Sequence, residues 1–174
     1  RYAQARVLCR RGGRVRTRAQ ARHRPGPCHG TSDTGDGDTD GTTVDVAGAS
    51  SLEFKVSVDP ANEDSVDYTY SVKNAGTDAL MMRIEMQSAG ESFIYIVNGA
   101  QEKVWVYSEG EWMDFSQMYP TYWETWNSAW QGYHNSLMDW TGYGDWSYTT
   151  PNGDSVRIYD IIINPSLPDS MFQQ

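Results

Sequence analysis

Cysteine is almost absent from this chain, and its two cysteines, Cys9 and Cys28, both lie in the first 30 of 174 residues. Everything from residue 31 onward therefore has neither a disulfide nor a thiol nucleophile. The sequence also lacks any run of about 18 apolar residues, the length that a membrane-spanning helix needs. No site for N-glycosylation occurs, because Asn164 is followed by Pro165.

Basic residues are scarce beyond the first 30 positions. Residues 1–30 contain nine Arg and no Lys, Asp or Glu, whereas residues 31–174 contain 23 acidic and five basic residues, a formal charge of −18. The five are Lys55, Lys73, Arg83, Lys103 and Arg157. Because binding to phosphate needs clustered Lys and Arg, we expect no nucleic-acid partner for this acidic body. Its charge suits either salty or extracellular surroundings or plain solubility, and both interpretations stay open.

Signatures of catalysis and of metal binding are missing as well. Of the three histidines only His134 lies in the acidic body, and a surface or hydrogen-bonded core histidine is the favoured interpretation. No His/Cys cluster has the spacing of metal ligands, and no nucleophile elbow or Walker pattern occurs. Carboxylate pairs such as Glu111/Asp114 arise by chance in so acidic a domain. We therefore expect no enzyme, no cofactor and no metal site.

Residues 1–30 lack the apolar segment of a signal peptide, since Val7-Leu8-Cys9 is their longest apolar run. Their composition predicts a disordered, Arg-rich tail with little folding value. An organellar transit peptide, a basic arm that binds nucleic acid, and translation from a wrong frame or start are the alternative explanations.

A flexible linker is predicted over residues 31–50, where Gly, Thr and Asp dominate. Cys28 precedes this stretch, as the lipid-bearing cysteine does at the mature N-terminus of a surface lipoprotein. Pro25-Gly26-Pro27 stands where an apolar lipobox is required, so Cys28 is a candidate lipid anchor without its usual signal. The aspartates between positions 33 and 40 are spaced partly like a calcium loop. They lack the Glu at the twelfth position and the flanking helices, which favours a linker.

Alternation of apolar and polar residues predicts an antiparallel meander from Ser51 onward. In the first predicted strand Leu52, Phe54 and Val56 share one face, while Glu53 and Lys55 lie on the other. Turn residues separate the segments, and the Asn98-Gly99 pair is a strong hairpin signal. The predicted strands are 51–58, 65–73, 79–88, 92–97, 103–108, 112–115, 146–150 and 155–163.

The hydrophobic period changes after residue 118. Large apolar residues recur at steps of three and four, the pattern of one stripe of an amphipathic helix. The stripe consists of Tyr119, Trp123, Trp126, Trp130, Tyr133 and Leu137. Pro120 suits the first turn of such a helix. An antiparallel sheet with one main Trp-rich helix packed on it predicts an α+β domain.

The aromatic stripe has two interpretations. Either its rings pack on the sheet and complete the core, or the helix leaves a cavity for an acyl chain or an apolar peptide. In the second case Leu80, Met82, Ile84 and Met86 would form the cavity wall, and Trp123, Trp126 and Trp130 its lid. A third interpretation is a glycan platform, for which Trp140, Tyr143 and Trp146 are the better candidates.

The segment Glu91–Met113, ESFIYIVNGAQEKVWVYSEGEWM, resembles the central hairpin of the LolA/LppX-like lipoprotein-carrier superfamily. In that family a strand reaches an Asn/Asp-Gly turn and an aromatic-rich strand returns. The preceding Met82–Met86 and the closing strand Ile158–Ile163 with its tail Asn164–Phe172 fit the same order. The resemblance covers roughly residues 51–172 and is closest to small surface lipoproteins of archaea and bacteria.

The resemblance implies a strongly curved antiparallel sheet, an incomplete barrel, with helices on its concave side. It also implies an extracytoplasmic location, no catalysis, and binding of lipid or a lipid-modified protein in the concavity. The helix that commonly precedes the first strand in this family is replaced here by the Gly/Asp spacer. Our leading hypothesis is a membrane-tethered cell-surface domain that binds lipid or another apolar partner. A structural or adhesive domain with a filled core and a glycan-binding module are its rivals.

Overall fold

The computed structural model describes residues 45–60 and 64–174. Thr43–Gln174 form a compact unit, and only that unit is considered below. The predicted tail over residues 1–30, the anchor candidate Cys28 and most of the linker lie outside the described residues. Within the last part of the predicted linker, Val46 and Ala49 are buried in the main core, so packing begins before the first strand.

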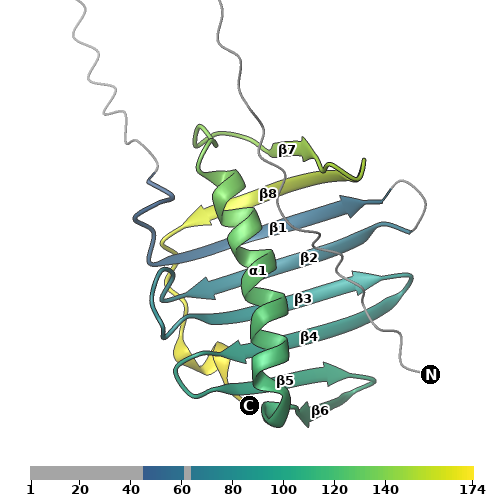
Figure 1. Ribbon diagram of the computed structural model, residues 1–174, viewed down its shortest axis with the longest axis vertical. Coiled ribbons are helices and arrows are strands. Elements are labelled where there is room, and N and C mark those ends of the chain that lie inside the picture. Colours follow the sequence, from purple (N-terminus) through teal and green to yellow (C-terminus); the bar gives the residue numbers. More distant parts are fainter. Residues whose placement is uncertain (1–44, 61–63) are drawn as a thin grey trace, which may run out of the picture. The chain divides into compact units, whose positions relative to one another are not determined.

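Eight antiparallel strands form one sheet in the order β6-β5-β4-β3-β2-β1-β8-β7 (Figure 1). The strands are β1 (Ser51–Asp59), β2 (Val66–Lys73), β3 (Met81–Ser88), β4 (Glu91–Asn98), β5 (Lys103–Ser108), β6 (Glu111–Asp114), β7 (Trp146–Thr149) and β8 (Ser155–Ile163). Each predicted strand is confirmed, with boundaries that differ by no more than two residues. Within the described residues β6 and β7 are unpaired edges, so the sheet is not closed into a barrel.

One long helix, α1 (Tyr119–Leu137), crosses one face of this sheet from the β5–β6 side to the β8–β7 side (Figure 1). A short 3-10 turn, η1 (Ser116–Met118), leads into it. Pro120 occupies the first turn, as predicted, where its missing N–H has no helical partner to lose. The predicted α+β class, an antiparallel sheet with one main helix, is therefore confirmed.

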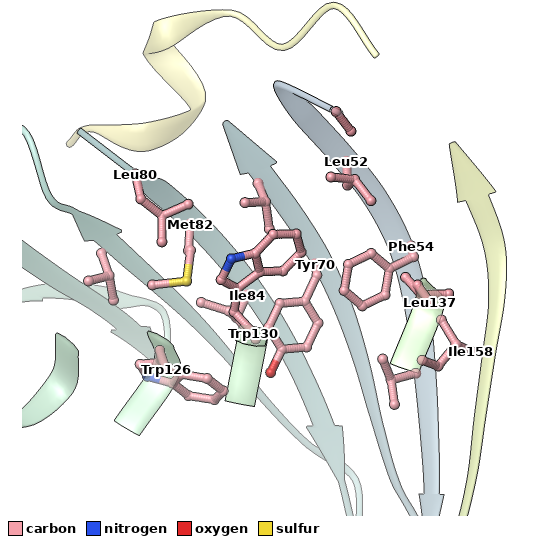
Figure 2. Packing of buried hydrophobic residues seen from close by; sticks show 14 of the residues in the cluster. Leu52, Phe54, Tyr70, Leu80, Met82, Ile84, Trp126, Trp130, Leu137 and Ile158 are labelled. Atoms are coloured by element: carbon pink, nitrogen blue, oxygen red, sulfur yellow. The ribbon is translucent and has the colours of Figure 1, made fainter. Parts of the chain in front are cut away.

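The face beneath α1, which we call the helix face, carries the main core. Leu52, Phe54 and Val56 of β1 are 0% exposed, as the alternation predicted. Figure 2 shows how these side chains meet those of neighbouring strands and of the helix. The rings of Phe54 and Tyr70 stack with centroids 5.2 Å apart, and the ring of Trp130 lies 6.1 Å from that of Phe54. Aromatic packing therefore joins the sheet to the helix.

The opposite side of the sheet, which we call the outer face, is partly covered by the C-terminal tail and the 3-10 turn η2 (Asp169–Phe172). A second apolar cluster forms there from Met81, Ile96, Leu167 and Phe172. Asn98 Nδ2 donates a hydrogen bond of 3.1 Å to the carbonyl oxygen of Phe172, and Lys73 Nζ donates one of 2.8 Å to that of Leu167. The tail thus packs on the sheet.

Candidate functional site

Three of the four predicted wall residues lie directly beneath the helix. Leu80 is 4% exposed, and Met82 and Ile84 are 0% exposed. The predicted lid residues Trp126 and Trp130 are 7% and 4% exposed, and all five belong to one buried cluster (Figure 2). The structure therefore brings the predicted wall and the predicted lid together. These five residues pack against one another as part of the core.

Trp123, the third lid residue, lies at the flank of the helix and is partly exposed. Its ring stacks on that of Tyr119 at 5.6 Å between centroids and covers the β4–β5 turn. A Cβ atom on Gly99 of this turn would lie 2.6 Å from the carbonyl oxygen of Leu80 and 3.0 Å from the Trp123 ring. Close packing thus requires the glycine of the Asn-Gly signal, although its φ is not in the left-handed region.

Met86, the fourth predicted wall residue, is only partly buried. Its position shows that burial of the helix-face residues decreases along the strands. On β3 burial falls from Met82 and Ile84 to Met86, and on β2 it falls from Tyr70, which is 1% exposed, to the partly exposed Tyr68. The loss runs toward the β1–β2 and β3–β4 turns. Figure 1 shows why, because α1 crosses the strands nearer their opposite ends.

Six apolar side chains lie on the half of the helix face beside α1, and we call the surface that they form the open shelf. It consists of Val58, Val66, Tyr68, Met86, Phe93 and Tyr148, all partly exposed. Strand register places Met86 directly between Tyr68 and Phe93. It also pairs Val58 with Val66 and, through the buried Val156, links Val58 to Tyr148. The open shelf therefore extends from β7 to β4, with partly exposed residues on five of these six strands and the buried Val156 on β8.

Helix α1 forms a wall along one side of the open shelf. The ring of Trp126 lies 6.4 Å from that of Tyr68 and 4.8 Å from that of Tyr95, and the ring of Tyr122 lies 6.3 Å from that of Tyr95. Burial raises the pKa values of the Tyr68, Tyr95 and Tyr148 hydroxyls. A tyrosine hydroxyl of ordinary pKa is already neutral at physiological pH, and these raised pKa values extend the neutral range further into alkali. The surface that these phenols form is therefore uncharged.

The basic residues of the acidic body all lie on the opposite side of the sheet. Register places the side chains of Lys55, Lys73, Arg83, Lys103 and Arg157 on the outer face. Four of them form ion pairs there, with N–O distances between 2.5 and 2.9 Å. The helix itself contains one acidic residue, Glu124, and no Lys or Arg. Its His134 lies 3.3 Å from the carbonyl oxygen of Val46 through Nε2, which fits the favoured interpretation of a hydrogen-bonded core histidine.

Carboxylates gather at the strand ends that border the open shelf. The turns β1–β2, β3–β4, β5–β6 and β7–β8 all lie at this end of the sheet. Their described acidic residues are Asp59, Asp64, Glu91, Glu109, Glu111 and Asp154, and their sequences contain no Lys or Arg. The rim of the open shelf is therefore negatively charged.

The hollows and titratable clusters of the described unit lie away from the predicted wall and lid or do not form a site. Two shallow hollows lie on the outer face, one beside the Lys55–Asp160 ion pair and one near Asp67 and Gln87, and neither contains a predicted wall or lid residue. No cluster of His, Cys, Asp or Glu that could hold a metal ion occurs in the described part of the chain. Among those same residues, no helix combines the length and the apolar character needed to cross a bilayer.

The three predicted glycan-stacking residues differ in exposure. Trp140 and Trp146 pack against the main core and donate indole hydrogen bonds of 3.0 Å to the Gly144 carbonyl oxygen and 2.7 Å to Ser136 Oγ. Tyr143 is 87% exposed, so the three rings do not form one flat exposed surface.

Sequence reasoning missed a different aromatic pair, Tyr107 and Trp112, which register places together on the outer face. Alternation along residues 103–108 and 112–115 carried this signal. The two rings lie 5.2 Å apart but are inclined by 53°, which is unlike the coplanar surface on which a sugar stacks.

Comparison with known proteins gives no relative for this chain: no family model, no curated protein and no solved structure matches it.

Proposed function

We propose that this protein is a non-enzymatic, extracytoplasmic and membrane-tethered domain that binds a lipid-modified or otherwise apolar partner on the open shelf. The observation that carries the proposal is the fall of burial along the helix face. The strands that bury Met82 and Tyr70 completely leave Met86 and Tyr68 partly exposed. Apolar side chains that adjoin one another on a single face mark interaction sites, whereas isolated ones do not.

The resemblance of the Glu91–Met113 hairpin to LolA/LppX-like carriers supports this proposal. In our account the sheet curves around α1 as an incomplete barrel, and the helix face is its concave side. The open shelf is then the part of the concavity that α1 leaves free. Cys28, outside the described residues, is the proposed lipid anchor.

The shelf is a less costly place for a ligand than the space beneath the helix. A ligand between α1 and the sheet would have to displace Trp126 and Trp130, whose burial stabilises the fold by about 1.5–3 kcal/mol each. On the open shelf Met86 can contact a partner directly while Trp126 serves as a wall. Leu80, Met82 and Ile84 stay in the packed core beneath α1, beside the shelf.

Binding of N-phenyl-1-naphthylamine, a neutral apolar fluorescent probe, tests the proposal on the full chain. We expect a saturable rise in emission, and we expect Phe93→Ser and Met86→Gln each to weaken binding about fivefold, because each removes about 1 kcal/mol of apolar contact. Ile162→Ser is the matched control, since Ile162 is a 49% exposed apolar residue on the outer face. An equal loss in the control, or no loss in the shelf variants, would contradict the proposal.

A structural or adhesive surface domain is the second candidate, and the filled core beneath α1 favours it. Such a domain would act through its acidic exterior and would need no apolar site. It predicts a folded protein, by circular dichroism, that shows no saturable binding of the same probe.

A further inference from the structure

The open shelf matches a second helix in shape and charge. We propose that its occupant is an amphipathic α-helix of a partner protein, with Lys or Arg on the polar side of that helix. This inference rests on the proposed function and specifies the partner that the same surface takes.

The dimensions of the shelf fit a helix that lies beside α1. Its six strands span about 24 Å at about 4.8 Å per strand, which a helix of about 16 residues crosses. Packed helices lie about 8–10 Å apart. Tyr70 contacts α1 through the rings of Trp126 and Tyr133, and Tyr68 and Val66 lie about 7 and 13 Å further along β2 at about 3.3 Å per residue. A second helix at the normal distance would therefore lie over these two residues.

The openness of the shelf favours a helix over a free acyl chain. Sites for small apolar ligands enclose most of the ligand's surface, whereas this half of the helix face is open and its residues are partly exposed. An amphipathic helix buries only one stripe and keeps its other side in water, as α1 does on the same sheet.

The charges around the shelf select the polar side of the partner helix. Carboxylates of four turns border the shelf, and the basic residues of the body lie on the other face of the sheet. Lys or Arg on the partner would therefore meet opposite charges, while Glu or Asp would be repelled. Because all of these rim charges except the partly exposed Asp154 are exposed, salt should weaken the preference.

Two fluorescein-labelled peptides of about 18 residues test the inference on the full chain. They share one stripe of Leu, and their polar positions carry Lys in the first peptide and Glu in the second. Measured by fluorescence anisotropy at low salt, the Lys peptide is expected to bind at least about tenfold more tightly, and the ratio is expected to shrink as salt is added.

Variants locate the interaction. Phe93→Ser is expected to weaken the Lys peptide at least about fivefold through the loss of apolar contact. The double variant Glu91→Gln/Glu111→Gln is expected to reduce the preference for Lys over Glu. Asp78→Asn/Glu102→Gln, which removes the same charge from exposed turns at the other end of the strands, is expected to leave the preference unchanged.

The outcomes separate a failure of the helical-partner inference from a failure of the proposed function. Equal or tighter binding of the Glu peptide, or no binding of the Lys peptide, overturns the inference. If only the naphthylamine probe or neutral phosphatidylcholine vesicles bind, and Phe93→Ser weakens that binding, the occupant is a lipid and the proposed function survives alone. If nothing binds at the shelf, both fail.

Discussion

Tyr70 shows how the aromatic core behaves at the scale of one residue. It is 1% exposed, its ring stacks on Phe54, and it meets the ring of Tyr133 edge-on at 5.4 Å. Burial raises the pKa of its hydroxyl well above the ordinary value, because a phenolate would have no water around it. The stability of the fold is therefore sensitive to alkali at this residue.

The sign of this sensitivity gives a first prediction. Above about pH 10 this phenol ionises in the unfolded chain but not in the folded chain. The contribution of Tyr70 to the free energy of unfolding is therefore complete below that pH and decreases as the pH rises further. Tyr70→Phe is expected to make the fall shallower, because the remaining buried tyrosines still contribute. Urea unfolding at several pH values from about 8 to 11 measures this. An unchanged pH slope would show that Tyr70 is not the residue responsible.

A second prediction concerns two glycines whose replacement by Ala should change the free energy of unfolding in opposite directions. Gly99 has no room for a Cβ beside the carbonyl oxygen of Leu80, whereas a Cβ on Gly132 in α1 would meet nothing within 4 Å. Gly99→Ala is expected to lower the free energy of unfolding by about 1–3 kcal/mol. Gly132→Ala is expected to raise it by about 0.5–1 kcal/mol, because Ala favours the helix. Denaturant unfolding of the two variants, compared with wild type, checks both values, and equal signs would contradict the described packing.

At the scale of the element, α1 is a structural part of the core. Trp130→Ala is expected to cost about 3–5 kcal/mol of stability, since the ring is 4% exposed. Trp123→Ala is expected to cost less, because this ring is partly exposed at the flank. Thermal or denaturant unfolding measures both. A cost below about 1 kcal/mol for Trp130→Ala would mean that the helix is a loosely held lid.

The sequence predicted elements better than their relative positions. Alternation of apolar and polar residues predicted the strands. The spacing of large apolar residues by three and four predicted which side of α1 faces the sheet. Neither pattern contains the position of the helix along the strands, so Met86 was grouped with Leu80, Met82 and Ile84 although α1 leaves Met86 partly exposed. That position depends on tertiary contacts, such as that of Trp123 with the β4–β5 turn.

The apolar residues on both faces of β4 could not be assigned to their packing partners from the sequence alone. Residues 92–97 of this strand are apolar on both faces, and at residues 96 and 97 both faces are covered. Val97 packs in the main core on the helix face, while Ile96 packs with Phe172 of the tail on the outer face. Apolar residues on both faces of a strand do not specify what covers each face, and here the partner of each face followed only from the fold.

At the scale of the whole described unit, charge is separated between the two faces of the sheet. The scarcity of basic residues was plain from composition, and their common face follows from strand parity at positions such as 55 and 83. What the sequence did not reveal is that four acidic turns come together at the border of an apolar surface. This combination distinguishes the open shelf from the outer face, where bases and acids are paired.

The most direct test of the central claim uses the methionines, which sample the distinct surfaces. Met86 lies on the open shelf, Met82 beneath α1, and Met81 on the outer face under the tail. Methyl NMR spectra of the full chain labelled with 13C at the methionine methyl groups would be recorded during titration with N-phenyl-1-naphthylamine. We expect the Met86 signal to move with the probe concentration while the signals of Met82 and Met81 stay in place. Movement of Met82 without Met86 would place the ligand beneath the helix and contradict the account.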